Sequence, residues 1–198
     1  MATVPRAADR TTADSLSSCH RARVTNPAIA YLALGSNLGD PIGQLIQARA
    51  AINEISGVNI TSASSLYESP AWGSDEPQPD YINAVVAVQT TLSSHALWSA
   101  TAKIEIAQGR IRSLLGVPVE RNAARTLDID LLLFADLQLR TGDLTLPHPR
   151  MFERDFVLLP LVEIAPRVVI AGHGTATQCL ERIAHINTRK LSPNFLWN

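Results

Sequence analysis

The order in which helix-like and strand-like segments alternate restricts the fold of this chain more than any other feature. Segments 41–56 and 94–107 repeat apolar residues at three-to-four spacing, which is typical of amphipathic helices. The order β-α-β-β-α-β with hairpin-like joins predicts an α+β fold: a ferredoxin-like antiparallel sheet with helices packed on one face, followed by a hairpin at 137–148 and additional C-terminal helices. Four apolar, β-prone runs supply the strands, at residues 28–35, 58–67, 81–91 and 126–134.

Both predicted helices have recognisable ends. Asp40 can cap free backbone amides, Pro41 suits the first helical position, and Gly57 supplies a stop. Ser93 can cap the second helix, which Gly109 ends. The side chains expected to face the sheet are those of Ile42, Leu45, Ile46, Ile52 and Ile55 in the first helix and Leu97, Trp98, Thr101 and Ile104 in the second.

Length and composition indicate one domain with a tail. The 198 residues, 46% hydrophobic and 18% charged, can bury a core and suit a single domain over residues 28–198. Residues 1–27 show no sustained period and are expected to form a flexible tail. Their arginines and serines resemble an organellar transit peptide, but Asp9 and Asp14 do not fit that pattern, so a plain extension is the preferred interpretation.

Charge and cysteine content exclude several classes of protein. A net charge of -1 argues against a surface devoted to nucleic acid or anionic membrane. Cys19 and Cys179 lie far apart without zinc or disulfide spacing, which indicates a reducing compartment. No apolar run approaches the roughly 18 residues of a membrane helix. We expect a soluble cytoplasmic monomer with neither nucleic acid nor membrane as a partner.

Two aspartates alternate with leucine and isoleucine in the run 126–134. Alternate strand residues share a face, so Asp128 and Asp130 point one way. Residues two apart on a strand lie roughly 6.6 Å apart, so both carboxylates can reach one divalent cation or flank two, and oxygen-only ligands favour magnesium. The alternative is that the pair faces water, as a bare pair more often does. The residues expected on the opposite face are Leu127, Ile129, Leu131 and Leu133.

A basic segment leads into the acidic strand. A guanidinium matches phosphate oxygens, and carboxylates together with arginines are typical of a metal–nucleotide site for phosphoryl transfer. The alternative is a solvated loop that forms salt bridges with the aspartates. The sequence contains no Walker or kinase glycine motif, so phosphates must be bound in another way. The arginines are Arg110, Arg112, Arg121 and Arg125.

Several motifs together resemble one enzyme family. RNAARTLDIDLL, NAVVAVQT after Tyr81, GRIR at 109–112, LPHPRMFERDFVLLPL at 146–161 and the opening AYLALGSNLGD closely resemble the hydroxymethyldihydropterin pyrophosphokinases of folate biosynthesis, in the family's order over residues 28–190. The resemblance implies that the hydroxymethyl oxygen of the acceptor attacks the β-phosphorus of ATP and that AMP departs. The alternatives are a pterin- or nucleotide-binding protein without catalysis and a single-stranded RNA binder that stacks bases on Tyr81, which the acidic pair and weak charge disfavour.

The resemblance assigns roles around the nucleotide. Asp128 and Asp130 correspond to ligands of two Mg²⁺ ions, and Arg110 and Arg125 to arginines that assist the transferred group. Taken alone, His148 would more often be a surface histidine, Glu105 suits a solvated helix face and Arg154 a helix surface. The residues implied to contact the nucleotide or lie near its phosphates are Glu105, Arg112, His148 and Arg154.

The resemblance also assigns an acceptor site. Tyr81 and Phe156 correspond to the two rings that stack on the pterin, and Asn83 offers a donor and an acceptor to its edge. Without the resemblance these three would be core aromatics and a strand-end polar residue. Trp72 and Gly73 lie in the proline-rich segment 69–80 and resemble part of a loop that closes over the substrate and excludes water.

The chain departs from the family pattern at three places. Ala123 and Ala124 replace a frequent Gly-Pro pair, which would change the rigidity of the catalytic loop without removing a chemical group. Ala102 stands where some members have glutamine, so one nucleotide hydrogen bond would be missing, and the N-terminal tail is longer than usual. None of these changes removes a residue that the resemblance makes catalytic.

Overall fold

The computed structural model describes residues 26–73, 77–110, 124–192 and 197. Six strands form one sheet: β1 (Ala28–Ser36), β2 (Val58–Ala63), β3 (Tyr67–Ser69), β4 (Tyr81–Thr90), β5 (Asp128–Phe134) and β10 (Arg189–Lys190). All pairs are antiparallel, in the order β10-β3-β4-β1-β5, with β2 also paired to β4. The mixed α and β architecture with an antiparallel sheet is as predicted. The predicted tail falls almost wholly on residues 1–25, outside the described part of the chain.

The run predicted as one strand over 58–67 is divided into β2 and β3, which follow one another along the same edge of β4. Ser64 lies at the break. Its N–H donates to the Val85 carbonyl at 2.9 Å, and its hydroxyl accepts from the Val85 N–H at 3.0 Å. A side-chain oxygen thus replaces a backbone carbonyl in the ladder, and the chain changes direction without leaving the Val85 backbone unpaired.

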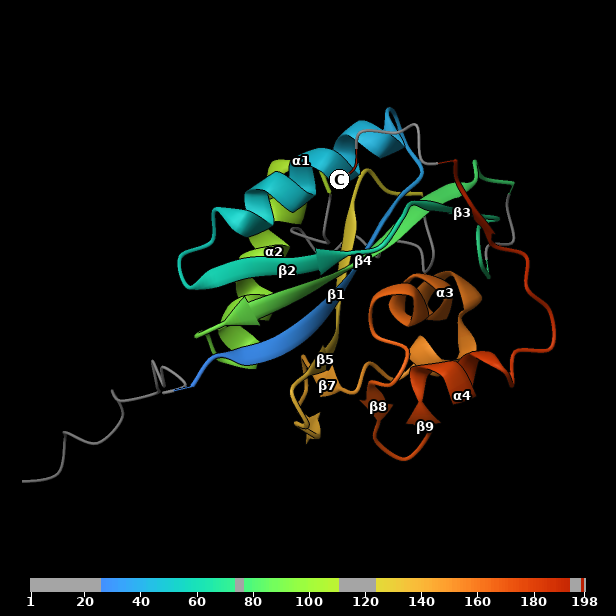
Figure 1. The fold of residues 1–198 in the computed structure, drawn as a ribbon. Coiled ribbons are helices and arrows are strands. Elements are labelled where there is room, and N and C mark those ends of the chain that lie inside the picture. The colour runs from blue at the N-terminus through green and yellow to red at the C-terminus, as the bar shows by residue number, and fades with distance from the viewer. Residues whose placement is uncertain (1–25, 74–76, 111–123, 193–196, 198) are drawn as a thin grey trace, which may run out of the picture.

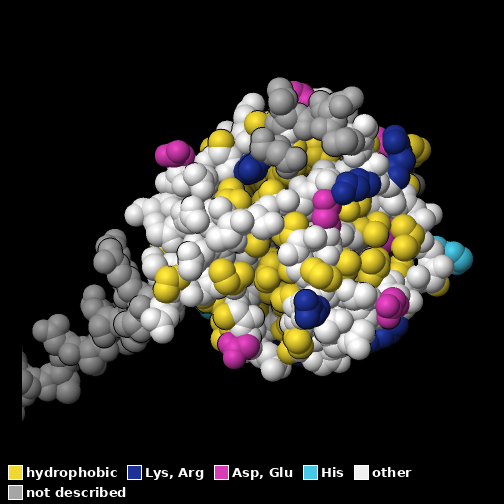
Figure 2. All heavy atoms as spheres, in the orientation of Figure 1, with side chains coloured by type: hydrophobic (Ala, Val, Ile, Leu, Met, Phe, Trp, Pro, Cys, Tyr) yellow, Lys and Arg dark blue, Asp and Glu magenta, His cyan; other side chains and the backbone are white. Residues whose placement is uncertain are grey.

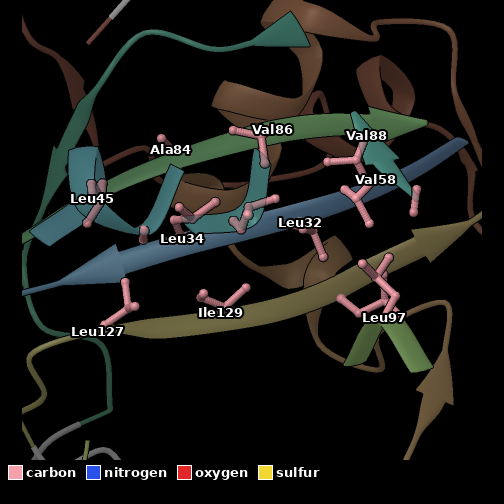
Figure 3. Close-up of a cluster of buried hydrophobic side chains, with 14 of the residues drawn as sticks. Leu32, Leu34, Leu45, Val58, Ala84, Val86, Val88, Leu97, Leu127 and Ile129 are labelled. Carbon is pink, nitrogen blue, oxygen red and sulfur yellow. The ribbon is translucent and has the colours of Figure 1, made fainter. Parts of the chain in front are cut away.

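One face of the sheet packs against α1 (Pro41–Asn53) and α2 (Ser94–Ala107), as Figure 1 shows. The predicted caps are present: Asp40 accepts from the Gly43 N–H at 3.0 Å, and Ser93 from the Ala96 N–H at 3.3 Å. The core between the layers is mainly apolar (Figure 3) and includes Leu32, Leu34, Leu45, Val58, Val86, Leu97 and Ile129. The prediction that Ile46 faces the sheet is wrong, because this side chain is 39% exposed. The buried residues of α1 are Leu45, Ala48 and Ile52.

The opposite face of the sheet is also covered (Figure 1). Here the short 3₁₀ helix η1 (Met151–Glu153), α3 (Asp155–Ile164) and α4 (Ala176–Leu180) enclose a second apolar cluster that includes Val85, Met151, Leu158 and Leu161. The predicted hairpin forms as β6 (Leu139–Arg140) with β7 (Thr145–Leu146), and β8 (Val169–Ile170) pairs with β9 (Gly174–Thr175). The additional C-terminal helices therefore form a third layer.

A bulge in β5 changes which residues face each layer. The pairing with β1 passes from Leu32↔Leu131 to Tyr31↔Leu133, so Leu132 is the extra residue. Leu131 lies in the cluster beneath α1 and α2, whereas Leu132 and Leu133 both lie in the cluster beneath α3. The prediction that Leu133 shares a face with Leu131 is therefore wrong, because a bulge shifts the alternation by one residue. The two aspartates precede the bulge and keep the predicted common face.

The surface drawn in Figure 2 is chemically mixed. Apolar side chains gather across the middle of this face, and the basic and acidic side chains lie scattered around them rather than in one patch of a single sign. Within the described part of the chain, no helix combines the length and apolar character needed to span a bilayer.

Candidate active site

A cavity lies between the start of α3 and the face of the sheet that α3 covers. Because alternate residues of a strand share a face, β1, β4 and β5 each contribute polar or small residues to it. Its lining residues are Ala33, Leu34, Gly35, Ser69, Pro70, Trp72, Tyr81, Asn83, Arg125, Asp128, Asp130, Arg154, Phe156 and Val157.

The floor of the cavity is open because its β1 residues are small. Ala33 pairs with Asp130 and Gly35 with Asp128 in the β1–β5 ladder, and Gly35 also pairs with Asn83 of β4. A Cβ atom at Gly35 would lie 3.3 Å from the Asn83 Oδ1 atom and 3.7 Å from the Tyr81 Cδ1 atom. Gly35 therefore leaves room between these two side chains. The strand predicted to end at Gly35 continues to Ser36.

Two arginines contact Asp128. The Arg110 Nη1 atom lies 2.5 Å from Asp128 Oδ1, and the Arg125 Nη1 atom lies 2.8 Å from Asp128 Oδ2. Burial opposes ionisation of Asp128 and is the largest single influence, but the two arginines outweigh it and lower its pKa. The salt bridges foreseen as an alternative to a phosphate site are therefore present. They also place two guanidinium groups where a phosphate could exchange with the carboxylate.

Glu105, on α2, contacts both Arg110 and the backbone of β5. Its side chain is fully buried, which excludes the solvated helix face considered from the sequence. One carboxylate oxygen accepts from the Ile129 N–H at 2.9 Å, and the same oxygen pairs with the Arg110 guanidinium. Glu105 thus fastens α2 to β5, the last strand in the sheet order, and holds Arg110 beside Asp128.

Asp130 has weaker partners than Asp128. His148 Nε2 and Arg154 Nη1 each lie 3.7 Å from its Oδ2 atom. Burial and the neighbouring Asp128 charge raise the pKa of Asp130, and His148, Arg154 and Arg110 offset this only in part. Two carboxylates on one strand face thus have pKa values displaced in opposite directions, a feature typical of functional sites.

His148 is held with a defined orientation. Its backbone N–H donates to the Leu132 carbonyl at 2.8 Å, and its Nδ1 atom accepts from the Arg150 N–H at 3.3 Å, which directs Nε2 toward Asp130. The side chain is only 20% exposed, unlike an ordinary surface histidine. Burial is the largest influence and, with Arg154 and Arg150 nearby, it lowers the pKa of His148 despite the two aspartates.

The aromatic and amide side chains predicted for an acceptor line the same cavity. Tyr81 on β4 and Phe156 on α3 are both partly exposed. The Asn83 side chain is nearly buried, and its Nδ2 atom donates to the Ser69 hydroxyl at 3.0 Å. Trp72 lines the cavity, whereas Gly73, next to it at a φ of 67°, is not among the lining residues. Ser69 also lines the cavity and was not predicted, because a serine at a strand end carries no distinctive signal in the sequence.

The comparisons with known proteins agree on one family. The family described as 7,8-dihydro-6-hydroxymethylpterin-pyrophosphokinase (HPPK) matches residues 31–166. A 2-amino-4-hydroxy-6-hydroxymethyldihydropteridine pyrophosphokinase of Haemophilus influenzae is 39% identical over 83% of this chain and 98% of its own length. A Bacillus subtilis protein of the same name is 41% identical over 71% of this chain and 80% of its own.

The chain belongs to the HPPK family. The predicted function is thereby confirmed: this pyrophosphokinase transfers pyrophosphate to hydroxymethyldihydropterin in folate biosynthesis. The fold agrees as well. A Plasmodium falciparum HPPK-DHPS structure with pterin and p-hydroxybenzoate has a TM-score of 0.62 at 14% identity, over 83% of this chain and 47% of that one. The pyrophosphokinase therefore spans about half the length of those longer chains.

Most of the predicted site residues of the pyrophosphokinase lie around this one cavity. Three of them do not line the cavity themselves. Arg110 contacts Asp128, His148 contacts Asp130, and Glu105 pairs with Arg110. Arg112 and Arg121, and the replacement at Ala123, lie outside the described residues.

Proposed function

We propose that this pyrophosphokinase is magnesium-dependent and that Asp128 and Asp130 hold two Mg²⁺ ions between them. The donor set fits the ion, because magnesium in nucleotide enzymes commonly takes one or two carboxylates and completes its shell with phosphate oxygens and water. The two side chains are 23% and 34% exposed toward the cavity, so both can meet an incoming ligand. Asp128 and Asp130 would hold the magnesium, which would supply positive charge to offset that of the phosphates.

The single observation that carries the proposal is that the acidic pair and the aromatic side chains line one cavity. Tyr81 and Phe156 would stack on the flat pterin, and Asn83 would pair with its edge. Trp72 and Gly73 would bound this acceptor site from the segment before β4. Glu105, Arg112, His148 and Arg154 would serve the nucleotide, with Arg154 near its phosphates.

The proposed reaction is attack of the acceptor hydroxymethyl oxygen on the β-phosphorus of ATP. The hydroxymethyl oxygen loses its proton to solvent and forms a bond to the β-phosphorus. The bond between the β-phosphorus and the oxygen that bridges it to the α-phosphorus breaks, and AMP leaves with this bridging oxygen. Arg110 and Arg125 would turn from Asp128 toward the transferred group and stabilise the negative charge that develops on it. The aromatic walls would exclude water, which would otherwise compete as the acceptor.

The test measures AMP and ADP formed from ATP and 6-hydroxymethyl-7,8-dihydropterin while Mg²⁺ is titrated into metal-free protein. We expect AMP alone, and only with magnesium. Asp128→Asn and Asp130→Asn should each lower turnover by about a thousandfold or more without loss of the fold. Asp136→Asn, at an exposed turn just after β5, is the matched control and should be unaffected. Formation of ADP, or near-normal rates in both site variants, would refute the proposal.

We also propose a fold type, a domain extent, an oligomeric state and a location for this pyrophosphokinase. The strand order β5-β1-β4-β2 supports a ferredoxin-like classification of the sheet. We take residues 28–198 as the pyrophosphokinase domain, acting as a monomer. The lack of any pairing pattern for Cys19 and Cys179 supports a cytoplasmic location. Light scattering during gel filtration gives the mass in solution, and a dimer mass would refute the monomer.

A further inference from the structure

Cationic and aromatic side chains connect the outer surface to the wall of the cavity. The guanidinium carbon of Arg150 lies 4.2 Å from the centroid of the Trp72 ring, and that of Arg154 lies 5.3 Å from the same ring. Arg154 also lies 5.6 Å from the Phe156 centroid. All three distances fall within the roughly 6 Å over which a guanidinium is attracted to an aromatic face. Arg154 therefore links two walls of the cavity, and Arg150 adds a contact to Trp72.

Trp72 depends on such contacts for its position. It lies between β3 and β4 in irregular backbone, and it is 40% exposed although it lines the cavity. A side chain on irregular backbone is not fixed by a ladder, so its rotamer is selected by its neighbours. Arg150 and Arg154 come from the segment that leads into α3, far away in the sequence, and so tie the Trp72 segment to the opposite side of the cavity.

Arg154 extends this connection to the acidic pair. Its Nη1 atom lies 3.7 Å from Asp130 Oδ2, and its buried Nε atom has no hydrogen-bond partner among the described residues. The two rings and Asp130 are thus the contacts that orient its guanidinium. A shift of Trp72 would open the aromatic wall and release one side of Arg154 at the same time.

Arg150, unlike Arg154, lies outside the cavity. It is exposed and does not line the cavity, so it has no direct access to a molecule bound there. Among the described residues, its guanidinium contacts the wall of the cavity at the Trp72 ring. We infer that Arg150 is a positioning residue of the acceptor site, which by stacking on Trp72 holds the indole against Arg154 and fixes the wall of the cavity. The inference rests on the proposed placement of the pterin in this cavity.

The first test compares steady-state constants of Arg150→Gln, which keeps a long polar side chain but removes the charge. The KM and the equilibrium Kd for 6-hydroxymethyl-7,8-dihydropterin should rise about two- to fivefold, the range expected for loss of an exposed cation–π contact. The kcat and the KM for ATP should stay within about twofold, because only acceptor binding is affected. Arg150→Lys should recover part of the loss, and Arg140→Gln, at an exposed arginine of β6, should change nothing.

The second test asks whether the effect passes through Trp72. In a Trp72→Leu background, Arg150→Gln should cause no further rise in the KM for the pterin, whereas a general structural defect would add its effect in both backgrounds. An unchanged KM in Arg150→Gln, or additive effects in the double variant, would overturn the inference. Tyr81→Leu distinguishes a failure of the Arg150 inference from a failure of the proposed acceptor site. If Tyr81→Leu raises the KM for the pterin while Arg150→Gln does not, only the role of Arg150 is refuted. If neither does, the acceptor site itself is misplaced.

Discussion

Asn37 and Arg125 hold each other by two hydrogen bonds across the entrance to β5. The Arg125 N–H donates to the Asn37 side-chain oxygen at 2.9 Å, and the Asn37 N–H donates to the Arg125 carbonyl at 3.2 Å. The Asn37 amide also donates to the Pro79 carbonyl at 3.1 Å and to the Gln78 side chain at 3.3 Å. One buried side chain thus joins the end of β1, the segment before β4 and the backbone of a proposed catalytic arginine.

Replacement of this side chain should impair catalysis more than its distance from the substrates suggests. In Asn37→Ala the Arg125 N–H loses its partner, so we expect a loss of about 1–3 kcal/mol in the free energy of unfolding. The kcat should fall by about tenfold or more, because Arg125 is no longer held in register with Asp128. Urea unfolding and steady-state assays of AMP release measure the two effects.

Asn37→Asp is the informative companion variant. It keeps the oxygen that accepts from Arg125 but loses the amide that donates to Pro79 and Gln78. If the bond to Arg125 is the important one, the kcat of Asn37→Asp should lie closer to the unmodified protein than that of Asn37→Ala. The reverse order would assign the role of Asn37 to the segment before β4 instead.

Glu105 offers a second test, at the back of the acidic strand. Glu105→Leu leaves the Ile129 N–H and the Arg110 guanidinium without this buried partner, so the protein should lose about 3–5 kcal/mol of stability. Glu105→Gln keeps an acceptor for Ile129 and should lose less, yet its kcat should still fall because Arg110 loses its ion pair with Glu105 and keeps only the one with Asp128. Thermal unfolding with parallel kinetic assays separates the two variants; equal kcat values for Glu105→Gln and the unmodified protein would contradict a role in holding Arg110.

These residues show how far the sequence alone could lead. Period and capping residues predicted both helices, and strand alternation placed Asp128 and Asp130 on one face, because such features depend on residues close together in the chain. The bulge at Leu132, the burial of Glu105 and the bonds of Asn37 depend on partners from distant segments. No local pattern distinguishes a glutamate that will meet a strand edge from one that will meet water. The resemblance to a family supplied the site residues that spacing could not.

Glu163 should make stability depend on pH in a defined direction. Its carboxylate accepts from the Ser65 hydroxyl and Tyr67 hydroxyl, each at 2.8 Å, and from Lys190 Nζ at 2.9 Å, which ties α3 to β3 and β10. Burial favours the neutral acid and is the largest single influence, but these hydrogen bonds outweigh it and lower the pKa of Glu163. Since the folded pKa lies below the unfolded value, the stabilisation is complete above the unfolded pKa and is lost as pH falls through the folded one.

The measurement compares urea unfolding of Glu163→Gln with that of the unmodified protein between pH 7 and pH 3. At neutral pH the variant should be less stable by about 1 kcal/mol, a modest value because the carboxylate is partly exposed and solvent screens its charge. The difference should shrink as the pH falls below about 4, near the ordinary glutamate pKa. A difference that stayed constant across this range would show that the charge of Glu163 does not contribute.

Trp197 should contribute to stability without contributing to catalysis. It is only 3% exposed in the cluster beneath α1 and α2, its indole N–H donates to the Ser64 carbonyl at 2.6 Å, and Arg49 lies over its ring at 5.3 Å. Trp197→Ala should cost about 3–5 kcal/mol of unfolding free energy, whereas Trp197→Phe keeps much of the packing and should cost less. Because Trp197 is not among the cavity-lining residues, kcat and both KM values should be unchanged well below the unfolding temperature. This tryptophan covers the break between β2 and β3 at Ser64. A fall in kcat in the folded Trp197→Ala protein would mean that a structural change at this break reaches the acceptor site through Ser69, at the end of β3.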